Sequence, residues 1–244
     1  MWTLVKITLG RLPVWLVATT FILASCVPIQ QEVVVVPQTT GSVWDAHTGD
    51  AVSQVTLRAR TENDEFYPSP PLTSDTPGQF SIPLWEEERT TWRLPTVGGS
   101  YRSGYVLEVS HADFMNGYML IAFIHPFQRQ TDGYPVLMYR EYTPLPDLLE
   151  ACTLRPATRH AWTLASDLNR LAREDWFNAL FISFGAEIYM IEEYLDSELN
   201  HFYRSCGISG EEQLAIQRTY RSAIELLIQN EAYLRTPNAR RQGF

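Results

Sequence analysis

The sequence predicts an α+β protein in which β-strands occupy the first part of the chain and helices the second. Up to about residue 142, apolar and polar residues alternate with the period of two that is typical of strands. After residue 158, apolar residues recur every three or four positions, as in amphipathic helices. Strands followed by helices favour an α+β fold over an alternating α/β fold. An export signal is expected before both parts.

Residues 1–25 have the features of a lipoprotein signal peptide. Lys6 and Arg11 precede an apolar run of roughly a dozen residues, whereas a helix that crosses a bilayer needs about 20. The residues LASC at 23–26 resemble the lipobox of bacterial lipoproteins, with an aliphatic residue and two small ones before the cysteine. The resemblance implies that Cys26 carries the lipid and becomes the first mature residue. An ordinary signal peptide and an uncleaved anchor are the alternatives.

Lipidation at Cys26 implies that the protein is held in the cell envelope. Val27 stands where an aspartate would favour retention in the inner membrane, which favours the periplasmic face of the outer membrane. Removing residues 1–25 leaves 17 basic and 28 acidic side chains, a net charge of −11. This acidic balance disfavours nucleic acid as a partner, because phosphates would be repelled. The expected partners are a membrane, through the lipid on Cys26, and another envelope protein.

The β part is expected to begin after a tether over residues 26–40, in which Val33–Val36 is able to pair as an edge strand. Strands are then expected at Ser42–Trp44 and at Gln54–Arg60, where apolar and polar residues alternate. Tyr67–Leu72 is rich in proline and is expected to be a loop. Further strands are expected around residues 80–82, 105–109, 118–124 and 135–139.

Turn and strand residues follow one another in a characteristic order, which comprises Gly41, Val43, Asp45, Thr48, Gly49, Thr73, Asp75, Gly78, Phe80, Gly104, Tyr105, Leu107, Val109 and Ser110. This order resembles the carboxypeptidase regulatory-like, or transthyretin-like, β-sandwich family over roughly residues 41–114. The resemblance implies an antiparallel β-sandwich over residues 41–142. Domains of this family are accessory modules that stabilise neighbours or bind partners, and they have no catalytic residues of their own.

An insertion at residues 85–103 is the most distinctive surface expected in the β part. It carries three consecutive acids between Trp85 and Trp92. Aromatic side chains on loops are costly to expose without a partner. Trp85, Trp92 and Tyr101 are therefore candidate contacts for a partner protein, or a platform for glycan or peptide. A solvated hairpin extension is the alternative.

The α part is expected to comprise a linker at residues 143–157, a helical region at 158–235 and a tail at 236–244. Apolar stripes continue from Trp162 to Phe202 without a proline or glycine between Arg173 and Trp176, so this stretch is one long helix or two.

Gly207 is expected to end a helix, since glycine is the commonest residue just after a helix C-terminus. Ser209 and Glu212 fit the capping box that starts the next helix. The α part is therefore expected to be a helical hairpin or a three-helix unit.

Cys152 and Cys206 remain once Cys26 is lipidated. In an oxidising compartment two remaining cysteines are most simply a disulfide, although two buried free thiols are the alternative. The bond would connect the linker to the turn after a helix and is expected to tie the helices to the β part.

Motifs of the common enzyme classes are missing from the sequence, including G-x-S-x-G, H-E-x-x-H, the phosphate-binding loop and C-x-x-C. Glu198 and His201 have the spacing of a di-iron ligand pair, but no second Glu-x-x-His accompanies them. His111 and Asp113 fit a turn better than a catalytic dyad. We therefore predict no catalytic residues, no metal and no cofactor.

The function expected from these observations is that of a non-catalytic, lipid-anchored envelope protein that docks onto another envelope component. A ligand-binding lipoprotein that recognises glycan or peptide is the second hypothesis. A hydrolase with dispersed catalytic residues ranks last.

Overall fold

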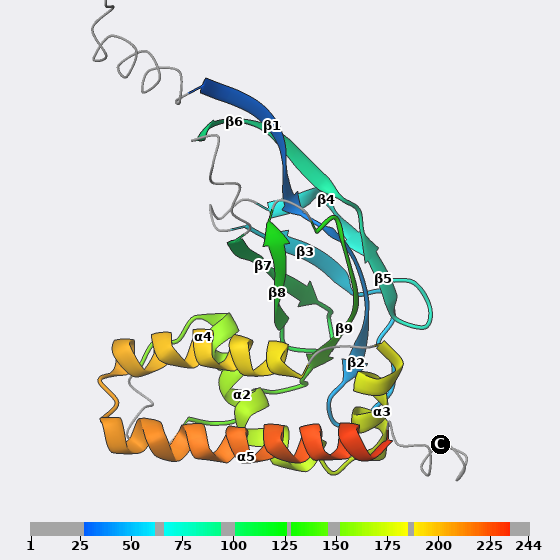
Figure 1. The fold of residues 1–244 in the computed structure, drawn as a ribbon. Coiled ribbons are helices and arrows are strands. Elements are labelled where there is room, and N and C mark those ends of the chain that lie inside the picture. Colours follow the sequence, from blue (N-terminus) through cyan, green and yellow to red (C-terminus); the bar gives the residue numbers. More distant parts are fainter. Residues whose placement is uncertain are drawn as a thin grey trace, which may run out of the picture.

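A computed structural model describes residues 27–61, 66–93, 101–125, 128–145, 152–184 and 188–234. Within these residues nine strands precede four helices, so the predicted α+β order is confirmed (Figure 1). The strands are β1 (Val27–Val36), β2 (Gln38–Asp45), β3 (Thr56–Arg60), β4 (Phe66–Thr73), β5 (Gln79–Ile82), β6 (Trp85–Arg93), β7 (Tyr101–Ser110), β8 (Gly117–His125) and β9 (Gln130–Met138). The helices are α2 (Pro156–Leu171), α3 (Asp175–Phe184), α4 (Tyr189–Cys206) and α5 (Gly210–Leu234).

The strands form a four-stranded sheet in the order β4-β3-β7-β8, a three-stranded sheet in the order β5-β2-β9, and a two-stranded ribbon of β1 and β6. Pairing is antiparallel except between β2 and β9, which are parallel. The prediction of a wholly antiparallel arrangement is therefore wrong for this pair. β9 follows β8 in the chain but joins the other sheet, so the two strands do not pair as a hairpin.

The three- and four-stranded sheets share one apolar core, and the alternation seen in the sequence faces this core. Leu57 and Ala59 of β3 and Leu107 of β7 are fully buried in it, together with Val43 of β2 and Val136 of β9. The polar residues between them lie on the other face of each sheet, as the period of two requires.

β1 and β6 form a ribbon where the sequence predicts a tether and a loop. Residues 27–34 of β1 pair with residues 86–93 of β6, and Figure 1 shows this ribbon extending away from the body on the side opposite the helices. Val34 and Val36 at its base are buried in the core between the sheets. The edge strand allowed at Val33–Val36 therefore exists, but it begins at Val27 and is part of the folded body at its base.

β4 contains the proline-rich stretch that was expected to be a loop. It is the edge strand of the four-stranded sheet, where a proline has no ladder hydrogen bond to lose on its free side. The register shifts between the pairs Leu57–Leu72 and Ala59–Tyr67, so residues 68–71 have no partners on β3. The prolines are accommodated in this irregularity.

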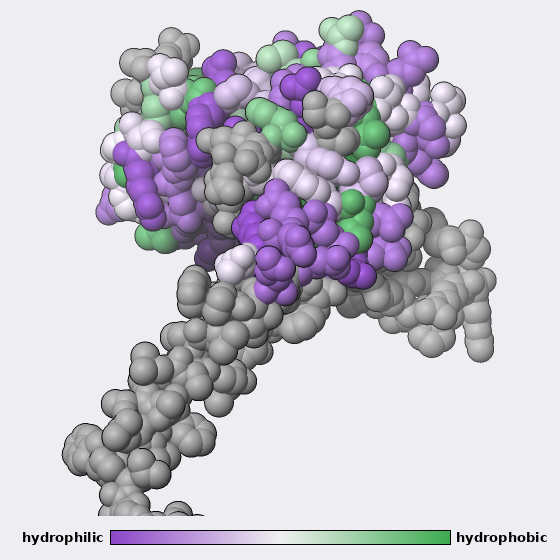
Figure 2. Space-filling model, turned by 90° about the horizontal axis from the view of Figure 1, so that it is seen from above, coloured by the Kyte–Doolittle hydropathy of each residue, from purple (hydrophilic) through white to green (hydrophobic). Residues whose placement is uncertain are grey.

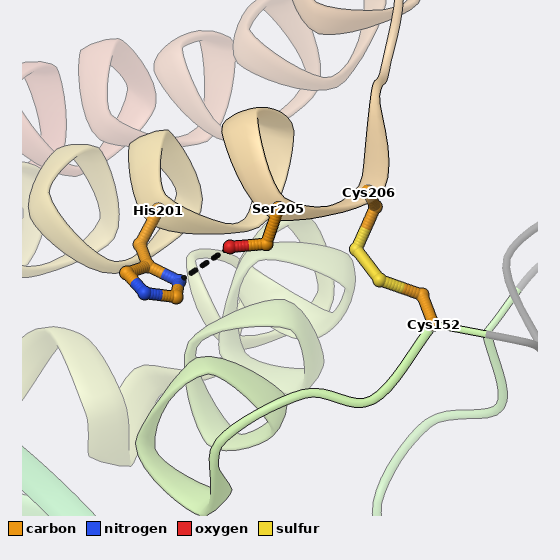
Figure 3. The surroundings of a disulfide bond; sticks show 4 residues. All are labelled: Cys152, His201, Ser205 and Cys206. Carbon is orange, nitrogen blue, oxygen red and sulfur yellow. Dashed lines mark hydrogen bonds between the residues drawn. A yellow bond between two sulfur atoms is a disulfide. The ribbon is translucent and has the colours of Figure 1, made fainter.

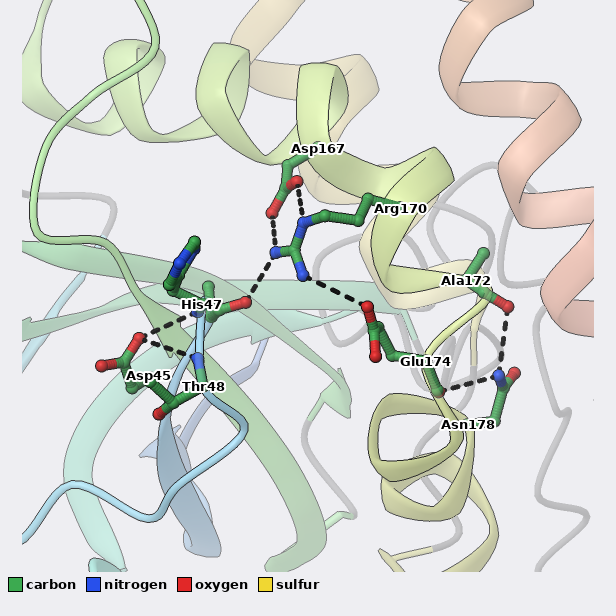
Figure 4. Close-up of polar contacts among 9 residues, drawn as sticks. Asp45, His47, Thr48, Asp167, Arg170, Ala172, Glu174 and Asn178 are labelled. Carbon is green, nitrogen blue, oxygen red and sulfur yellow. Dashed lines mark hydrogen bonds and ion pairs between the residues drawn. The ribbon is translucent and has the colours of Figure 1, made fainter.

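Residues 158–204 contain three helices where the sequence predicts one or two. α2 ends at Leu171 and α3 begins at Asp175. The side-chain amide of Asn178 donates to the carbonyl oxygens of Ala172 at 3.1 Å and Glu174 at 3.0 Å (Figure 4). These bonds satisfy carbonyl groups that the end of a helix leaves without partners, so the chain can turn without proline or glycine.

The boundary between α4 and α5 agrees with the sequence. Gly207 follows α4 in the left-handed conformation with φ +64°, and its N–H donates to the carbonyl of Tyr203. The Glu212 carboxylate accepts from the N–H of Ser209 at 3.0 Å, while the Ser209 hydroxyl accepts from the N–H of Glu212 at 3.3 Å. The predicted capping box is confirmed.

The helices form a layer at one end of the sheets (Figure 1). α2 packs against α4, α5 and β8, and the apolar core of this layer includes Tyr118, Leu137 and Tyr139 from the β part. The two halves are therefore continuous. Among the described helices, none combines the length and the apolar character that crossing a membrane requires.

Candidate functional site

The residues proposed as an aromatic contact surface are separated in the structure. Trp85 pairs with Val36 at the base of β6 and Trp92 pairs with Pro28 near its far end, a distance of about 23 Å at 3.3 Å per residue. The Trp85 ring is half-buried and stacks on Tyr67, with 4.6 Å between centroids. Tyr101 begins β7 in another sheet. The side chains of Trp92 and Tyr101, and all of Cys26, lie outside the described residues, so their proposed contacts stay predictions.

Cys152 and Cys206 form the predicted disulfide, with 5.7 Å between their Cα atoms (Figure 3). The bond joins the segment before α2 to the last residue of α4. It therefore closes the helical layer at the point where the linker enters. His201 lies nearby on α4, where its Nδ1 is 3.2 Å from the Ser205 hydroxyl.

Glu198 and His201, the metal-like pair, have separate partners. Glu198 is buried, where its carboxylate accepts from the Thr158 hydroxyl at 2.8 Å and pairs with Arg155 at 3.3 Å. His201 is exposed. Within the described ranges, no three His, Cys, Asp or Glu side chains are grouped so that they could hold a metal ion. His111 caps a turn, since its Nδ1 accepts from the N–H of Asp113 at 3.2 Å.

A cleft of about 460 Å³, here called the arginine cleft, lies between the outer face of the four-stranded sheet and α4. Its floor includes Gly104 opposite Ala122 and Val106 opposite Leu120 in the pairing of β7 with β8. The small residues give the cleft its depth. A Cβ at Gly104 would lie 3.0 Å from the carbonyl oxygen of Ile121, so with a larger residue the backbone of β8 would have to shift by a few tenths of an ångström.

Charged side chains from both halves of the protein line the arginine cleft. Its arginines are Arg60 from β3, Arg102 from β7 and Arg155 from the residue before α2. Glu193 and Glu198 of α4 face them, with Arg102 Nη2 2.5 Å from Glu193 Oε2 and Arg155 Nη2 3.3 Å from Glu198 Oε2. Among the residues that the structure describes, the lining therefore holds three arginines and two glutamates.

Sequence reasoning missed the arginine cleft. One feature of the sequence points to the cleft. Gly104 occupies an outward-facing position of a strand, and the outward-facing Arg102 lies two residues before it. The glutamates on the opposite wall lie far away in the sequence, and their placement depends on how α4 packs.

A second cavity of about 400 Å³ lies beside Tyr139, Asp167 and Arg170. The guanidinium group of Arg170 already has partners in the protein. It donates to both Asp167 carboxylate oxygens at 2.7 and 2.6 Å and to the carbonyl of Ala46 at 2.7 Å (Figure 4). Burial raises the pKa of Tyr139 well above its usual value, so this phenol stays protonated. The cavity is best explained as part of the packing contact between α2 and the turn that follows β2.

That turn is held by a buried carboxylate. Asp45 accepts from the N–H of His47 at 2.8 Å and of Thr48 at 3.4 Å, and pairs with Arg140 at 3.0 Å. Because this charge is removed from water, each of these bonds is needed to offset its desolvation. The arrangement positions the turn for the Ala46–Arg170 contact with α2.

His160 on α2 is buried among Tyr118, Tyr139 and Tyr194, and it connects β9 with α4. Its Nε2 lies 3.0 Å from the Leu137 carbonyl and its Nδ1 2.9 Å from the Tyr194 hydroxyl. Burial lowers the pKa of His160 to about 4, although the hydrogen bond to Leu137 acts in the opposite direction. The histidine is therefore neutral at pH 7.

Comparisons with protein families, with curated proteins and with solved structures gave no match for this chain. The function therefore has to be inferred from the geometry and chemistry of the molecule itself.

Proposed function

We propose that this protein is a non-catalytic, lipid-anchored protein of the cell envelope that docks onto another envelope component. The observation that carries the proposal is the position of β1, which begins at Val27, the residue after Cys26 in the sequence. The β1–β6 ribbon extends away from the body (Figure 1). A lipid on Cys26 would lie at the far end of this ribbon, and the helical layer would face away from the membrane.

The ribbon would serve as a spacer. Its first six residues, 27–32, precede the buried valines and span about 20 Å at 3.3 Å per residue. An isolated two-stranded ribbon is only marginally stable, but here the base is held by Val34 and Val36 in the core. The body would therefore be kept off the bilayer by paired strands.

The hydropathy of the surface supports this orientation. Figure 2, which looks from above onto the end that carries the ribbon, shows a mainly hydrophilic coloured surface with scattered apolar residues. A surface of this kind has little apolar area to place in a membrane. On the far side, α5 exposes Leu214 and Ile228, each 51% accessible, which are candidate contacts for a protein partner.

We also infer that the β part is a transthyretin-like sandwich. The support is that two sheets share one core and that residues of the family pattern occupy turn positions. Gly78 has a φ of +82°, which favours glycine, and Asp75 accepts from the N–H of Gln79 at 2.8 Å. Accessory modules of this family suit a docking role better than a catalytic one.

Lipidation is tested by expression of the full chain in a Gram-negative bacterium supplied with an alkyne-labelled fatty acid. The wild-type chain should take up the label and sediment with the membranes, and Cys26→Ser should lose both properties. Cys152→Ser is the matched control, because it removes a thiol that the proposal does not lipidate. A labelled Cys26→Ser variant would refute the anchor.

Docking is tested by crosslinking in intact cells followed by purification of the solubilised protein. We expect an envelope protein to be recovered with it in stoichiometric amount. Leu214→Arg and Ile228→Arg should each reduce the amount of this partner that is recovered. Ile124→Arg is the control, because Ile124 is equally exposed, at 54%, but lies on β8. Retention of glycan without a protein partner would favour the ligand-binding alternative. Equal loss in all three variants would contradict docking through α5.

A further inference from the structure

We propose that, in the free protein, one exposed side of α5 is covered by α5 of a second copy of this chain, with the two helices side by side and antiparallel. The contact is made by residues at spacings of three and four, here called the α5 stripe, which are Leu214, Arg218, Arg221, Glu225 and Ile228. All five are exposed. Residues at this spacing lie on one side of a helix.

The apolar residues of the α5 stripe lie at its two ends. Leu214 and Ile228 are each 51% accessible, and each lies seven residues from Arg221. Two antiparallel α5 helices centred near residue 221 therefore bring Leu214 of one copy to Ile228 of the other. Because the contact is repeated by the two-fold symmetry, all four side chains leave water, which favours association.

The charged residues of the α5 stripe are also self-complementary. Arg218 lies three residues before Arg221, and Glu225 lies four residues after it. The antiparallel arrangement therefore brings Arg218 of each copy close to Glu225 of the other, whereas a parallel arrangement would oppose like charges. Among the described side chains, neither Arg218 nor Glu225 forms an ion pair within its own chain, so both charges are available to a second copy.

The centre of the contact tolerates the approach of two arginines. Arg221 Nε lies 3.8 Å from Glu192 Oε1 and its Nη2 lies 3.6 Å from Asp196 Oδ2, both on α4. These carboxylates offset the repulsion between the two guanidinium groups. Beside the α5 stripe, the exposed residues Ala215 and Ser222 are small, so the two helices can approach closely.

The position of α5 allows two copies to pair with their ribbons on the same side. α5 lies across the end of the molecule that is opposite the β1–β6 ribbon (Figure 1). A two-fold axis along the length of the molecule would make two α5 helices antiparallel and leave both ribbons pointing the same way. Such isologous pairs are the commonest homo-oligomers. The second copy would occupy the side of α5 that the proposed function gives to an envelope component, so the two partners would exclude each other.

Sedimentation velocity of the purified full chain in detergent tests the pairing without an envelope component. A contact of this size gives a weak dimer, so about 0.1 mM protein is needed to populate it. We expect the wild-type protein to sediment as a dimer there. Arg218→Glu and Glu225→Arg should each weaken self-association about tenfold, because each change places like charges together twice in the dimer.

Combining these variants separates the contact from a general effect of charge. A mixture of Arg218→Glu protein with Glu225→Arg protein should form mixed dimers about as strongly as the wild type, since every charge then meets its opposite. The double variant that carries both changes should also dimerise. Arg58→Glu is the matched control, because it makes the same change of charge at an exposed position of β3 and should leave association unaltered.

The proposal is overturned if the wild-type protein is monomeric at this concentration, a result that leaves docking in cells, which is measured separately, unaffected. It is also overturned if all variants sediment as dimers, since the detergent micelle or another surface would then hold the two copies. A mixture that stays monomeric, or a loss of association in Arg58→Glu as large as that in Arg218→Glu, would have the same consequence.

Discussion

His160 lies where β9, α2 and α4 meet. Three hydrogen-bond contacts surround it, but the neutral side chains there have only two protons to donate. Nε2 faces the Leu137 carbonyl, Nδ1 faces the Tyr194 hydroxyl, and this hydroxyl also lies 3.0 Å from the Ala157 carbonyl. A neutral imidazole and a tyrosine supply two protons for these three contacts. An imidazolium would supply the third, but desolvation of the charge outweighs this gain and lowers the pKa to about 4.

The buried histidine should make stability depend on pH. Its pKa is about 4 in the folded protein and about 6.5 in the unfolded chain, so the unfolded chain binds more protons between these values. The stability that His160 contributes is fully present above pH 6.5 and is lost as the pH falls towards 4. At pH 5 this loss lowers the free energy of unfolding by about 2 kcal/mol. Urea unfolding at pH 7.5 and pH 5 measures this difference.

In His160→Leu, this part of the pH dependence should disappear. At pH 7.5 the variant should be less stable by about 1–3 kcal/mol, because the Leu137 carbonyl loses its donor. His201→Leu is the control, since His201 is exposed on α4 and should change neither quantity. An unaltered pH dependence in His160→Leu would show that other groups cause it.

For β1 the sequence correctly indicates a strand but predicts too short a length for it. Four consecutive valines indicate a strand, but the residues before them are too polar to predict pairing locally. Their partner is β6, which begins about 50 residues later and was expected to be a loop. β6 carries charged side chains that suit an exposed ribbon, where one edge of each strand remains open.

Truncation of a valine at the base of β1 distinguishes a core strand from a tether. Val36 is fully buried, so Val36→Ala should lower the free energy of unfolding by about 1–3 kcal/mol. Gln30→Ala, on the exposed part of the same strand, should change it by less than about 0.5 kcal/mol. Equal effects would mean that β1 does not contribute to the core.

At the scale of the whole molecule, the β and α parts are joined by contacts near the two ends of α2. Near its start His160 contacts the Leu137 carbonyl at the end of β9, and in its last turn Arg170 binds the Ala46 carbonyl after β2. The disulfide acts within the α part, between the entry to α2 and the end of α4. It therefore holds the segment that enters α2 against the end of α4. The expectation that the bond also ties the helices to the β part stays a prediction.

Loss of the disulfide should weaken the whole protein without altering its fold. Cys152 and Cys206 are 54 residues apart, and opening a loop of that length should lower the free energy of unfolding by roughly 4 kcal/mol on the chain-entropy model. The double variant with serine at both positions and the reduced wild-type protein should unfold at the same lower urea concentration. A wild-type protein indifferent to reductant would contradict the pairing.

The sequence by itself determined what depends on neighbouring residues and on counting cysteines. The order of strands and helices, the end of α4 at Gly207, the capping box of α5 and the pairing of Cys152 with Cys206 all follow from it. Periodicity, backbone conformation and local hydrogen bonds act over a few residues, so they can be recognised in the chain. The break between α2 and α3 was missed because Asn178, unlike proline or glycine, does not reveal a turn.

The tertiary structure decided the pairing of β1 with β6, the parallel pairing of β2 with β9 and the arginine cleft. Each of these depends on segments far apart in the chain. Strand pairing depends on which edges remain available once the core has formed, and a charged cleft depends on the packing of a helix over a sheet. Local preferences do not encode such choices, because the free energy that favours them arises only when the distant surfaces meet.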